Sequence, residues 1–181
     1  RRGASRLRMK IHKSEKKTLI DYRPEAANQR QRIGDWERDC MYGAVGKRIL
    51  VCVDRKSRFL KLARVKEASV RSVNALTSTL LSSTQKPIYS ITNDNGPEFR
   101  YSTGLAAPVF YCHPRKPQQR GTVENSIGLL RQYIKRKTNL DEITDQDLSA
   151  IENAINFRPR KSLDYRTPHE VFYETTVALA M

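Results

Sequence analysis

Short apolar runs separated by turn residues dominate the first half of the chain. Three of them lie at residues 36–43, 49–53 and 59–65, and they are rich in the aromatic and β-branched residues that favour strands. Turn residues such as Gly43 and Ser57 separate these runs at short intervals. Three consecutive strands with short connections predict an antiparallel meander.

The spacing of apolar positions then changes. Over residues 67–83 apolar side chains recur every three or four positions, which predicts an amphipathic helix. Short apolar runs at residues 88–91 and 109–112 predict two more strands. This order predicts an α/β fold with a mixed five-stranded sheet, three antiparallel strands followed by two parallel additions, flanked by helices.

A second helical pattern covers residues 121–137. Its apolar stripe consists of Val123, Ile127, Leu130 and Ile134. Glu124 lies at the border of that stripe, and Gly128, Arg131 and Lys135 follow it along the same face. Glutamate is also common in the first turn of helices because it complements the helix dipole, so a plain surface residue is the alternative interpretation of Glu124.

Two threonines indicate further helix starts toward the C-terminus. Thr144 precedes Asp147 by three residues, and Thr167 precedes Glu170 by the same interval. This is the spacing of a capping box, in which each side chain bonds the other's backbone. We therefore expect one helix after each threonine.

Charge narrows the choice of partner. The 181 residues carry 34 Lys and Arg against 19 acids, a net charge of +15 that attracts polyanions such as nucleic acid. Residues 1–33 hold eleven of these cations and three acids without apolar periodicity. We expect a basic arm or linker there, with a solvated tail as the alternative, and one folded domain over residues 34–176.

Cysteine placement and hydropathy exclude several classes. Cys40, Cys52 and Cys112 lie in apolar surroundings without Cys-x-x-Cys spacing, so neither a zinc site nor a disulfide framework is expected. No apolar run has the length of a membrane span, and no leader pattern is present. We expect a reducing, cytoplasmic setting. The chain opens on Arg1 and is expected to be a fragment of a longer protein.

Three acids are candidates for chemistry because of their positions. Asp39 lies within the first predicted strand, Asp94 follows the strand at residues 88–91, and Glu124 opens a helix. A carboxylate within a strand needs a partner, and the ends of strands in α/β sheets are the usual place for active groups. If the first strand is central, all three carboxylates meet at one end of the sheet.

A divalent ion would relieve the repulsion between three acids that have no evident cationic partner. Oxygen-only ligands favour Mg²⁺ or Mn²⁺. Two such ions would activate an attacking oxygen and stabilise a leaving oxygen at phosphorus. The excess of Lys and Arg would bind the phosphates of the substrate.

Each acid also has an alternative interpretation in which it has no role in chemistry. Asp94-Asn95-Gly96 is a hairpin-turn signal, and Asp39 could face solvent on an edge strand. Other acids are alternative candidates for the catalytic positions. Glu37 shares the strand face of Asp39. Asp54 is expected to form a salt-bridged turn, and Glu98 is expected to begin a surface segment.

Five ordered motifs carry a resemblance to a known family. They are Trp36-Glu37-Arg38-Asp39, Val53-Asp54-Arg55-Lys56-Ser57-Arg58-Phe59, Asn93-Asp94-Asn95-Gly96-Pro97-Glu98-Phe99, Gln119-Arg120-Gly121-Thr122-Val123-Glu124-Asn125 and Asn156-Phe157-Arg158-Pro159-Arg160-Lys161-Ser162-Leu163. Together they resemble the catalytic core of DDE transposases of the insertion-sequence thirty family, over residues 33–172. More distantly, the chain is similar to retroviral integrase cores.

The resemblance implies an RNase H-like fold in which Asp39, Asp94 and Glu124 are the catalytic, metal-binding acids. It also implies an N-terminal domain that binds DNA ends, expected ahead of the basic arm. The implied activity is hydrolysis of a phosphodiester at the element end, followed by attack of the freed 3′-OH on target DNA. The implied partners are DNA, as element ends and target, and a second copy of the chain.

Basic residues near Glu124 are the expected DNA contacts. We expect Arg120, Arg131, Lys135 and Arg136 to neutralise the DNA backbone, with Asn125 beside Glu124. No general-base histidine is needed, since the metals would activate the nucleophile.

The motifs depart from the family at a few positions. Arg38 stands beside Asp39 where a glycine is usual, and Gln118 and Lys137 are further departures. The interval between Asp94 and Glu124 is short for the family, and we place the deletion at residues 101–108. These departures leave two alternatives open: a catalytically silent DNA-binding remnant, and a nuclease of the same fold that cleaves without joining.

Overall fold

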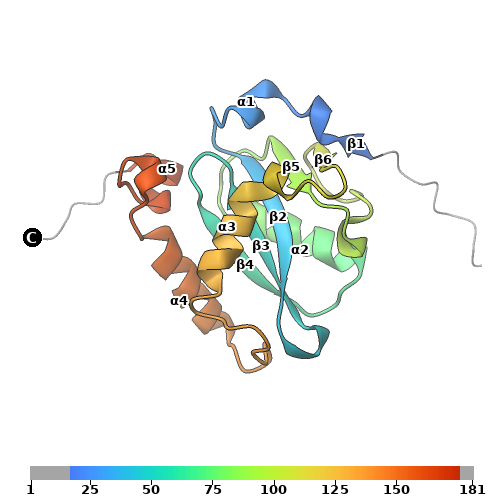
Figure 1. The fold of residues 1–181 in the computed structure, drawn as a ribbon, viewed down its shortest axis with the longest axis vertical. Coiled ribbons are helices and arrows are strands. Elements are labelled where there is room, and N and C mark those ends of the chain that lie inside the picture. The colour runs from blue at the N-terminus through green and yellow to red at the C-terminus, as the bar shows by residue number, and fades with distance from the viewer. Residues whose placement is uncertain (1–16, 176–181) are drawn as a thin grey trace, which may run out of the picture.

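The computed structural model describes residues 17–175. Six strands form one sheet in the order β1-β6-β5-β2-β3-β4 (Figure 1). The strands are β1 (Thr18–Leu19), β2 (Asp35–Tyr42), β3 (Arg48–Asp54), β4 (Leu60–Val65), β5 (Ser90–Asn93) and β6 (Val109–Tyr111).

Strand pairing confirms the predicted mixed sheet. β2, β3 and β4 pair antiparallel, β5 pairs parallel with β2, and β6 pairs parallel with β5. The sixth strand, β1, pairs parallel with β6. Its two residues are too few to produce an alternation that the sequence could reveal.

Helices cover both faces of the sheet. The α-helices are α1 (Glu25–Asn28), α2 (Val70–Ser82), α3 (Gly121–Leu130), α4 (Asp145–Asn156) and α5 (Pro168–Tyr173). Short 3-10 turns are η1 (Ile20–Tyr22), η2 (Ala44–Gly46), η3 (Pro97–Phe99), η4 (Pro117–Arg120) and η5 (Lys161–Leu163). Figure 1 shows α3 and α4 on the near side of the sheet and α2 behind it.

The core is divided between these two faces because side chains of a strand alternate. In β3, Leu50 and Cys52 join the cluster that contains Val73 and Leu81 of α2. The other apolar residues of β3 join a second cluster, with members from α3 and α4: Ile49, Val51 and Val53. Both faces are covered, which explains why the strand is an unbroken apolar run.

Residues 17–33, expected to belong to the basic arm, fold onto the sheet as β1, η1 and α1. Ile20 and Ala27 are buried there, and Arg23 donates to Thr92 Oγ1 of β5 at 3.1 Å. The prediction of an arm over residues 1–33 is therefore wrong for residues 17–33, and residues 1–16 lie outside the described residues.

The helix predicted over residues 121–137 ends earlier, at Leu130, which corrects that prediction. Beyond it the chain turns toward the β2–β3 connection, where Ala44 N donates to Thr138 O at 2.9 Å. Gly43 allows this approach, since a β-carbon there would lie 2.4 Å from Leu140 Cγ. The apolar periodicity continues to Ile134, which is buried beyond the helix end.

Both predicted capping boxes are present. Thr144 begins α4 with Asp147 as its partner, and Thr167 begins α5 with Glu170. Within residues 17–175, no helix has the length and apolar character needed to cross a membrane.

Candidate active site

The three predicted acids lie at the end of the sheet where β2 and β5 diverge. In the parallel pairing of these strands, Glu37 is opposite Thr92. Continuing that register by two residues places Asp39 of β2 opposite Asp94, which follows β5 directly. Glu124 lies in the first turn of α3, which packs on the same face of β2. The sheet therefore brings the three positions together.

One guanidinium joins all three carboxylates. Arg120 Nη1 lies 2.7 Å from Asp39 Oδ2 and 3.8 Å from Asp94 Oδ2, and Nη2 lies 3.3 Å from Glu124 Oε1. The expectation that these acids have no cationic partner is therefore wrong. Arg120 ends the 3-10 turn η4 immediately before α3, so the chain places it four residues ahead of Glu124.

The carboxylates are only partly accessible to water. The side chains of Asp39, Asp94 and Glu124 are 18%, 31% and 37% exposed. Burial raises the pKa of Asp39, whereas the charge of Arg120 opposes that shift. Burial lowers the pKa of Arg120, but Asp39 and Asp94 raise it further, so the net shift is upward.

Backbone donors hold two of the acids in place. Cys40 N donates to Asp39 Oδ1 at 2.7 Å, and Gly96 N donates to Asp94 Oδ1 at 2.9 Å. Each acid therefore keeps its second oxygen for Arg120 or for a ligand.

Glu37 fixes the start of α3 rather than joining the site. Its Oε2 accepts from Val123 N at 2.9 Å, and its Oε1 is ion-paired with Arg55. The carboxylate thus occupies the positive end of the helix dipole. This contact positions Glu124, one residue farther along α3.

The two other competing acids are structural, but not as predicted. Asp54 is buried and accepts from Gly34 N and from the backbone and hydroxyl of Ser57, at 2.7–2.8 Å. It is not part of a salt-bridged turn. Glu98, expected on the surface, is 5% exposed, and its Oε1 accepts from Tyr42 Oη at 2.8 Å. The sequence gives no signal for that contact, which spans 56 positions.

Arg38 does not intrude on the acids. Side chains of neighbouring strand residues point to opposite faces, and the guanidinium of Arg38 is buried on the face away from α3. Its Nε donates to Asn93 Oδ1 and its Nη1 to Thr77 Oγ1, both at 2.7 Å. It also lies over the ring of Phe99, with 4.7 Å from Cζ to the ring centroid.

The remaining predicted DNA contacts extend along and beyond α3. Asn125 is exposed beside Glu124, and Lys135 and Arg136 are exposed in the turn after the helix. Lys135 and Arg136 do not share a helix face with Glu124, because α3 ends before them. Arg131 is half-buried and donates through Nη2 to Tyr42 O at 2.8 Å.

A cleft of about 260 Å³ opens beside Asp94 and Arg120, with Arg115 and Lys116 on its wall. No group of three His, Cys, Asp or Glu side chains in residues 17–175 forms a ready-made metal cluster. The three acids gather around Arg120 instead.

Comparison with known proteins identifies relatives among transposases. No family model matches the chain. It is 40% identical over 169 residues to the transposase InsI for insertion sequence element IS30A of Escherichia coli (strain K12), which covers 90% of this chain and 43% of the relative. It is 37% identical over 158 residues to the transposase for insertion sequence element IS1086 of Cupriavidus metallidurans, covering 84% and 47%.

The fold is shared with viral integrases. A chain of the simian T-cell lymphotropic virus intasome, in complex with PP2A regulatory subunit B56 gamma, matches with a TM-score of 0.64 at 21% identity, covering 81% of this chain and 56% of that one. The catalytic core domain of BIV integrase matches with a TM-score of 0.57 at 22% identity, covering 78% and 94%.

The chain spans about half the length of the curated relatives it matches. It is thus a homologue of the IS30-type transposases that carries the RNase H-like fold of a retroviral integrase catalytic core.

Proposed function

We propose that this chain is the catalytic core of a DNA transposase, with Asp39, Asp94 and Glu124 as its catalytic acids. The observation that carries the proposal is their convergence on one guanidinium, Arg120. Three separate elements supply these carboxylates to one end of the sheet. Asp39 and Asp94 are opposite each other because of the parallel register of β2 and β5. The cluster therefore depends on the arrangement of the sheet and is not a chance grouping of surface acids.

The carboxylates suit one or two divalent ions. Their oxygens are the hard ligands that Mg²⁺ and Mn²⁺ prefer, and they already hold a positive charge among them. Such ions, when bound, would activate the attacking oxygen and stabilise the leaving oxygen of a phosphodiester. Partial burial of Asp39 would strengthen its interaction with a cation, because solvent screens it less.

Basic residues around the acids would hold the DNA. Arg115, Lys116 and Arg120 border the cleft next to Asp94. Arg120 can exchange its carboxylate partners for a phosphate oxygen, because guanidinium binds both through the same paired donors. Asn125, Lys135 and Arg136 would extend the contact along the DNA strand. Arg131, at the end of α3, would contribute a further positive charge while it is bonded to the last residue of β2.

The full proposed reaction has two chemical steps. Water attacks the phosphodiester at the element end and releases a 3′-OH, and this hydroxyl then attacks a phosphodiester of the target. Two element ends must be processed together, so we expect the active complex to be a dimer or larger.

The alternative of a silent DNA-binding remnant rests on Arg38 and on the short loop at residues 101–108. Arg38 is buried on the far face of the sheet, bonded to Asn93 and Thr77. The short loop leaves Asp94 and Glu124 in contact with the same arginine. Both observations favour an intact catalytic site.

Oligonucleotide assays test the proposal. Asp39→Asn, Asp94→Asn and Glu124→Gln should each lower Mn²⁺-dependent cleavage and joining of element-end DNA by the full-length protein. The loss should exceed the ~10–100-fold that removal of an outer-shell partner of a metal site costs. The matched control is Glu142→Gln, an exposed acid in the turn beyond α3, which should retain the parent rates.

Two outcomes would change the assignment. Parent rates in the Glu124→Gln protein would exclude Glu124 as a ligand. Cleavage of intact element ends, without joining of an end that is already nicked at the 3′ side, would favour a hydrolytic nuclease.

A further inference from the structure

The turn that joins α4 to α5 gathers cations and aromatic rings for which the proposed reaction has no role. Residues 157–166 contain four Lys and Arg against one acid, Asp164. The exposed side chains of this turn include Phe157, Arg158, Lys161, Tyr165 and Arg166. Tyr165 is 69% exposed, and the basic residues beside it in the turn make this surface both aromatic and positively charged.

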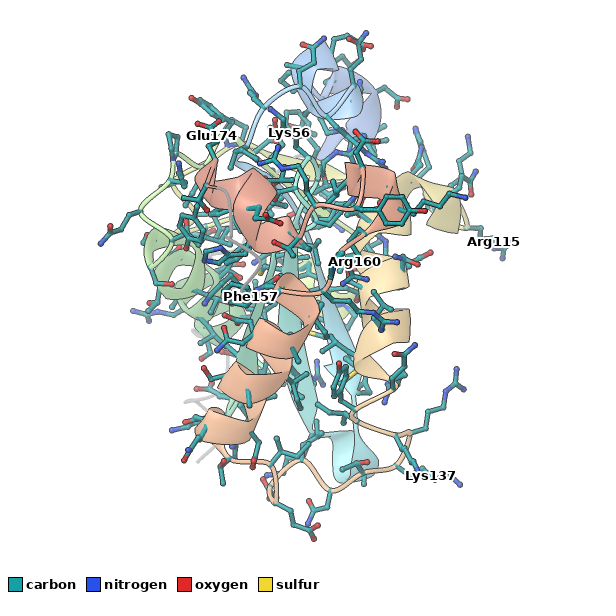
Figure 2. The ribbon with its side chains drawn as sticks, turned by 90° about the vertical axis from the view of Figure 1, so that its left-hand side faces the viewer. Lys56, Arg115, Lys137, Phe157, Arg160 and Glu174 are labelled. Carbon is teal, nitrogen blue, oxygen red and sulfur yellow. The ribbon has the colours of Figure 1, made fainter. Side chains whose placement is uncertain are left out.

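The turn is continuous with the end of α3. Arg158 Nη1 donates to Gln132 Oε1 at 3.3 Å, across 26 positions of sequence. Burial and the charge of Arg158 lower the pKa of Arg160, while Tyr133 opposes the shift. Figure 2 shows Arg160 on the side of α4 that faces α3. Tyr133 is itself 45% exposed.

We call this surface the basic-aromatic patch. It consists of Tyr133, Arg158, Arg160, Lys161, Tyr165 and Arg166. None of these residues touches the three proposed catalytic acids in a contact that the structure describes.

The backbone presents Tyr165 in a conformation that costs energy. Asp164 and Tyr165 have φ angles of 53° and 61°, a left-handed conformation that residues with a β-carbon seldom adopt. Hydrogen bonds hold it there: Tyr165 N donates to Arg160 O at 2.9 Å, and Arg160 N donates to Arg166 O at 3.0 Å. The side chain that this conformation presents is mostly exposed, and strain of this kind is concentrated at functional sites.

The residues just before the turn behave differently. Glu152 and Asn156 are buried and bond the backbone of β4, so their role is within the fold. The change from buried, fully bonded side chains to exposed rings and cations occurs within two residues, at Phe157 and Arg158.

Exposed guanidinium groups and exposed rings together fit a nucleic-acid strand with unpaired bases. Cations neutralise phosphates of any strand, whereas aromatic rings stack only on bases that are not paired in a duplex. We propose that the basic-aromatic patch binds a DNA strand carrying unpaired bases.

The location of the patch favours a strand that also reaches the catalytic acids. Glu124 lies six residues before the end of α3, about 9 Å along the helix axis, and Tyr133 follows shortly after. A strand held at Glu124 would therefore reach the patch within a few nucleotides. The proposal itself does not depend on catalysis, because binding to the patch requires no metal.

Fluorescence anisotropy in EDTA tests the proposal with the 181-residue chain. The probes are a labelled single-stranded DNA of about 12 nucleotides, within the range of known site sizes, and its duplex. Tyr165→Asn removes the ring, and asparagine tolerates the positive φ angle. It should weaken single-strand binding by about 5-fold or more and duplex binding by less than about 2-fold.

A charge variant tests the other half of the patch. Arg158→Gln combined with Lys161→Gln should weaken binding to both probes. For the single strand, the slope of log K against log salt should fall by about 1.4, at about 0.7 for each phosphate contact. The matched control for charge combines Lys66→Gln and Arg71→Gln, both exposed, one between β4 and α2 and one in the first turn of α2.

The aromatic control is Tyr22→Asn, which removes the ring of a residue in η1 that is 76% exposed. Circular dichroism checks the fold of each variant. If Tyr165→Asn fails to fold, the same single-strand and duplex measurements are made with Tyr133→Ser. The proposal is overturned if neither ring variant weakens single-strand binding more than Tyr22→Asn does, or if duplex binding falls equally. Tighter binding of an RNA probe of the same sequence would overturn the assignment to DNA.

Discussion

Arg120 carries one positive charge among three carboxylates, the arrangement in which a divalent ion would also be stable. Its side chain is only 14% exposed, and each of its contacts is within 3.8 Å. A cation entering the site must therefore displace the guanidinium or share the acids with it. Competition of this kind lowers the apparent affinity for the ion, because the displaced charge must find a new partner.

Replacing Arg120 should expose that competition. We expect Arg120→Gln to bind Mn²⁺ about 10-fold more tightly than the parent chain, equivalent to ~1.4 kcal/mol, because the competing charge is gone. In EDTA the same variant should unfold at a lower temperature, since three carboxylates then repel without a counter-charge. Calorimetric titration with Mn²⁺ and thermal unfolding with and without the ion measure both effects.

Lys66→Gln serves as the control, because it removes one exposed charge at the far edge of the sheet. Unchanged or weaker Mn²⁺ binding by Arg120→Gln would show that the guanidinium does not compete with the ion.

Sequence reasoning located the acids but not their partner. Asp39 and Asp94 were found because they lie in and after apolar strands. The contact between Arg120 and Glu124 has the four-residue spacing of a helix pair and could have been anticipated. The contact between Arg120 and Asp39 spans 81 positions, so only the folded chain reveals it.

Among the elements, α4 completes the edge of the sheet. β4 lies at that edge, where one side of the strand lacks a neighbouring strand. Asn156 Oδ1 accepts from Leu60 N at 2.8 Å, and its Nδ2 donates to Leu60 O at 2.9 Å. Glu152 Oε2 accepts from Leu62 N at 2.8 Å. Helix side chains thus replace the missing strand.

Removing the Asn156 side chain should be costly. Asn156→Ala leaves both backbone groups of Leu60 buried without partners, and we expect a loss of about 2–4 kcal/mol in the free energy of unfolding. Urea denaturation measures it. Asn153→Ala, at an exposed position of the same helix, should be neutral or slightly stabilising, since alanine favours helix. Equal effects of the two substitutions would mean that the contact with β4 adds no stability.

The start of α3 depends on Glu37. Its carboxylate is buried between Val123 N and Arg55. We expect Glu37→Ala to lower the free energy of unfolding by ~3–5 kcal/mol, because Arg55 remains buried without its counter-charge. Glu37→Gln keeps an acceptor for Val123 N and should lose less. Chemical denaturation of both variants checks the order, and a loss below about 1 kcal/mol in Glu37→Ala would contradict it.

Most elements follow from local patterns, and the exceptions have a common cause. The strands and α2 were predictable because apolar spacing differs between strand and helix. The end of α3 was not, because contacts with Gly43 and Ala44 in another part of the chain set it. β1 was missed for the same reason: its pairing with β6 joins residues more than 90 positions apart.

In the whole molecule, the positive charge extends well beyond the residues of the candidate site. The net charge of +15 includes seven Lys and Arg against one acid, Glu15, within residues 1–16. The first strand of the sheet, β1, begins at Thr18, so a deletion of residues 1–16 removes none of the six strands. A deletion to residue 30, by contrast, would remove β1, η1 and α1.

We expect binding of duplex DNA by the 181-residue chain to weaken steeply as salt rises, because cations released from the phosphates drive the association. Deletion of residues 1–16 should make the slope of log K against log salt shallower by about 0.9 for each phosphate contact that these residues supply. Anisotropy titrations over a series of salt concentrations measure the slope, and Asn156→Ala should show a reduced stability without a change in slope. A slope that is the same with and without residues 1–16 would identify that segment as a solvated tail and leave DNA attraction to the folded domain.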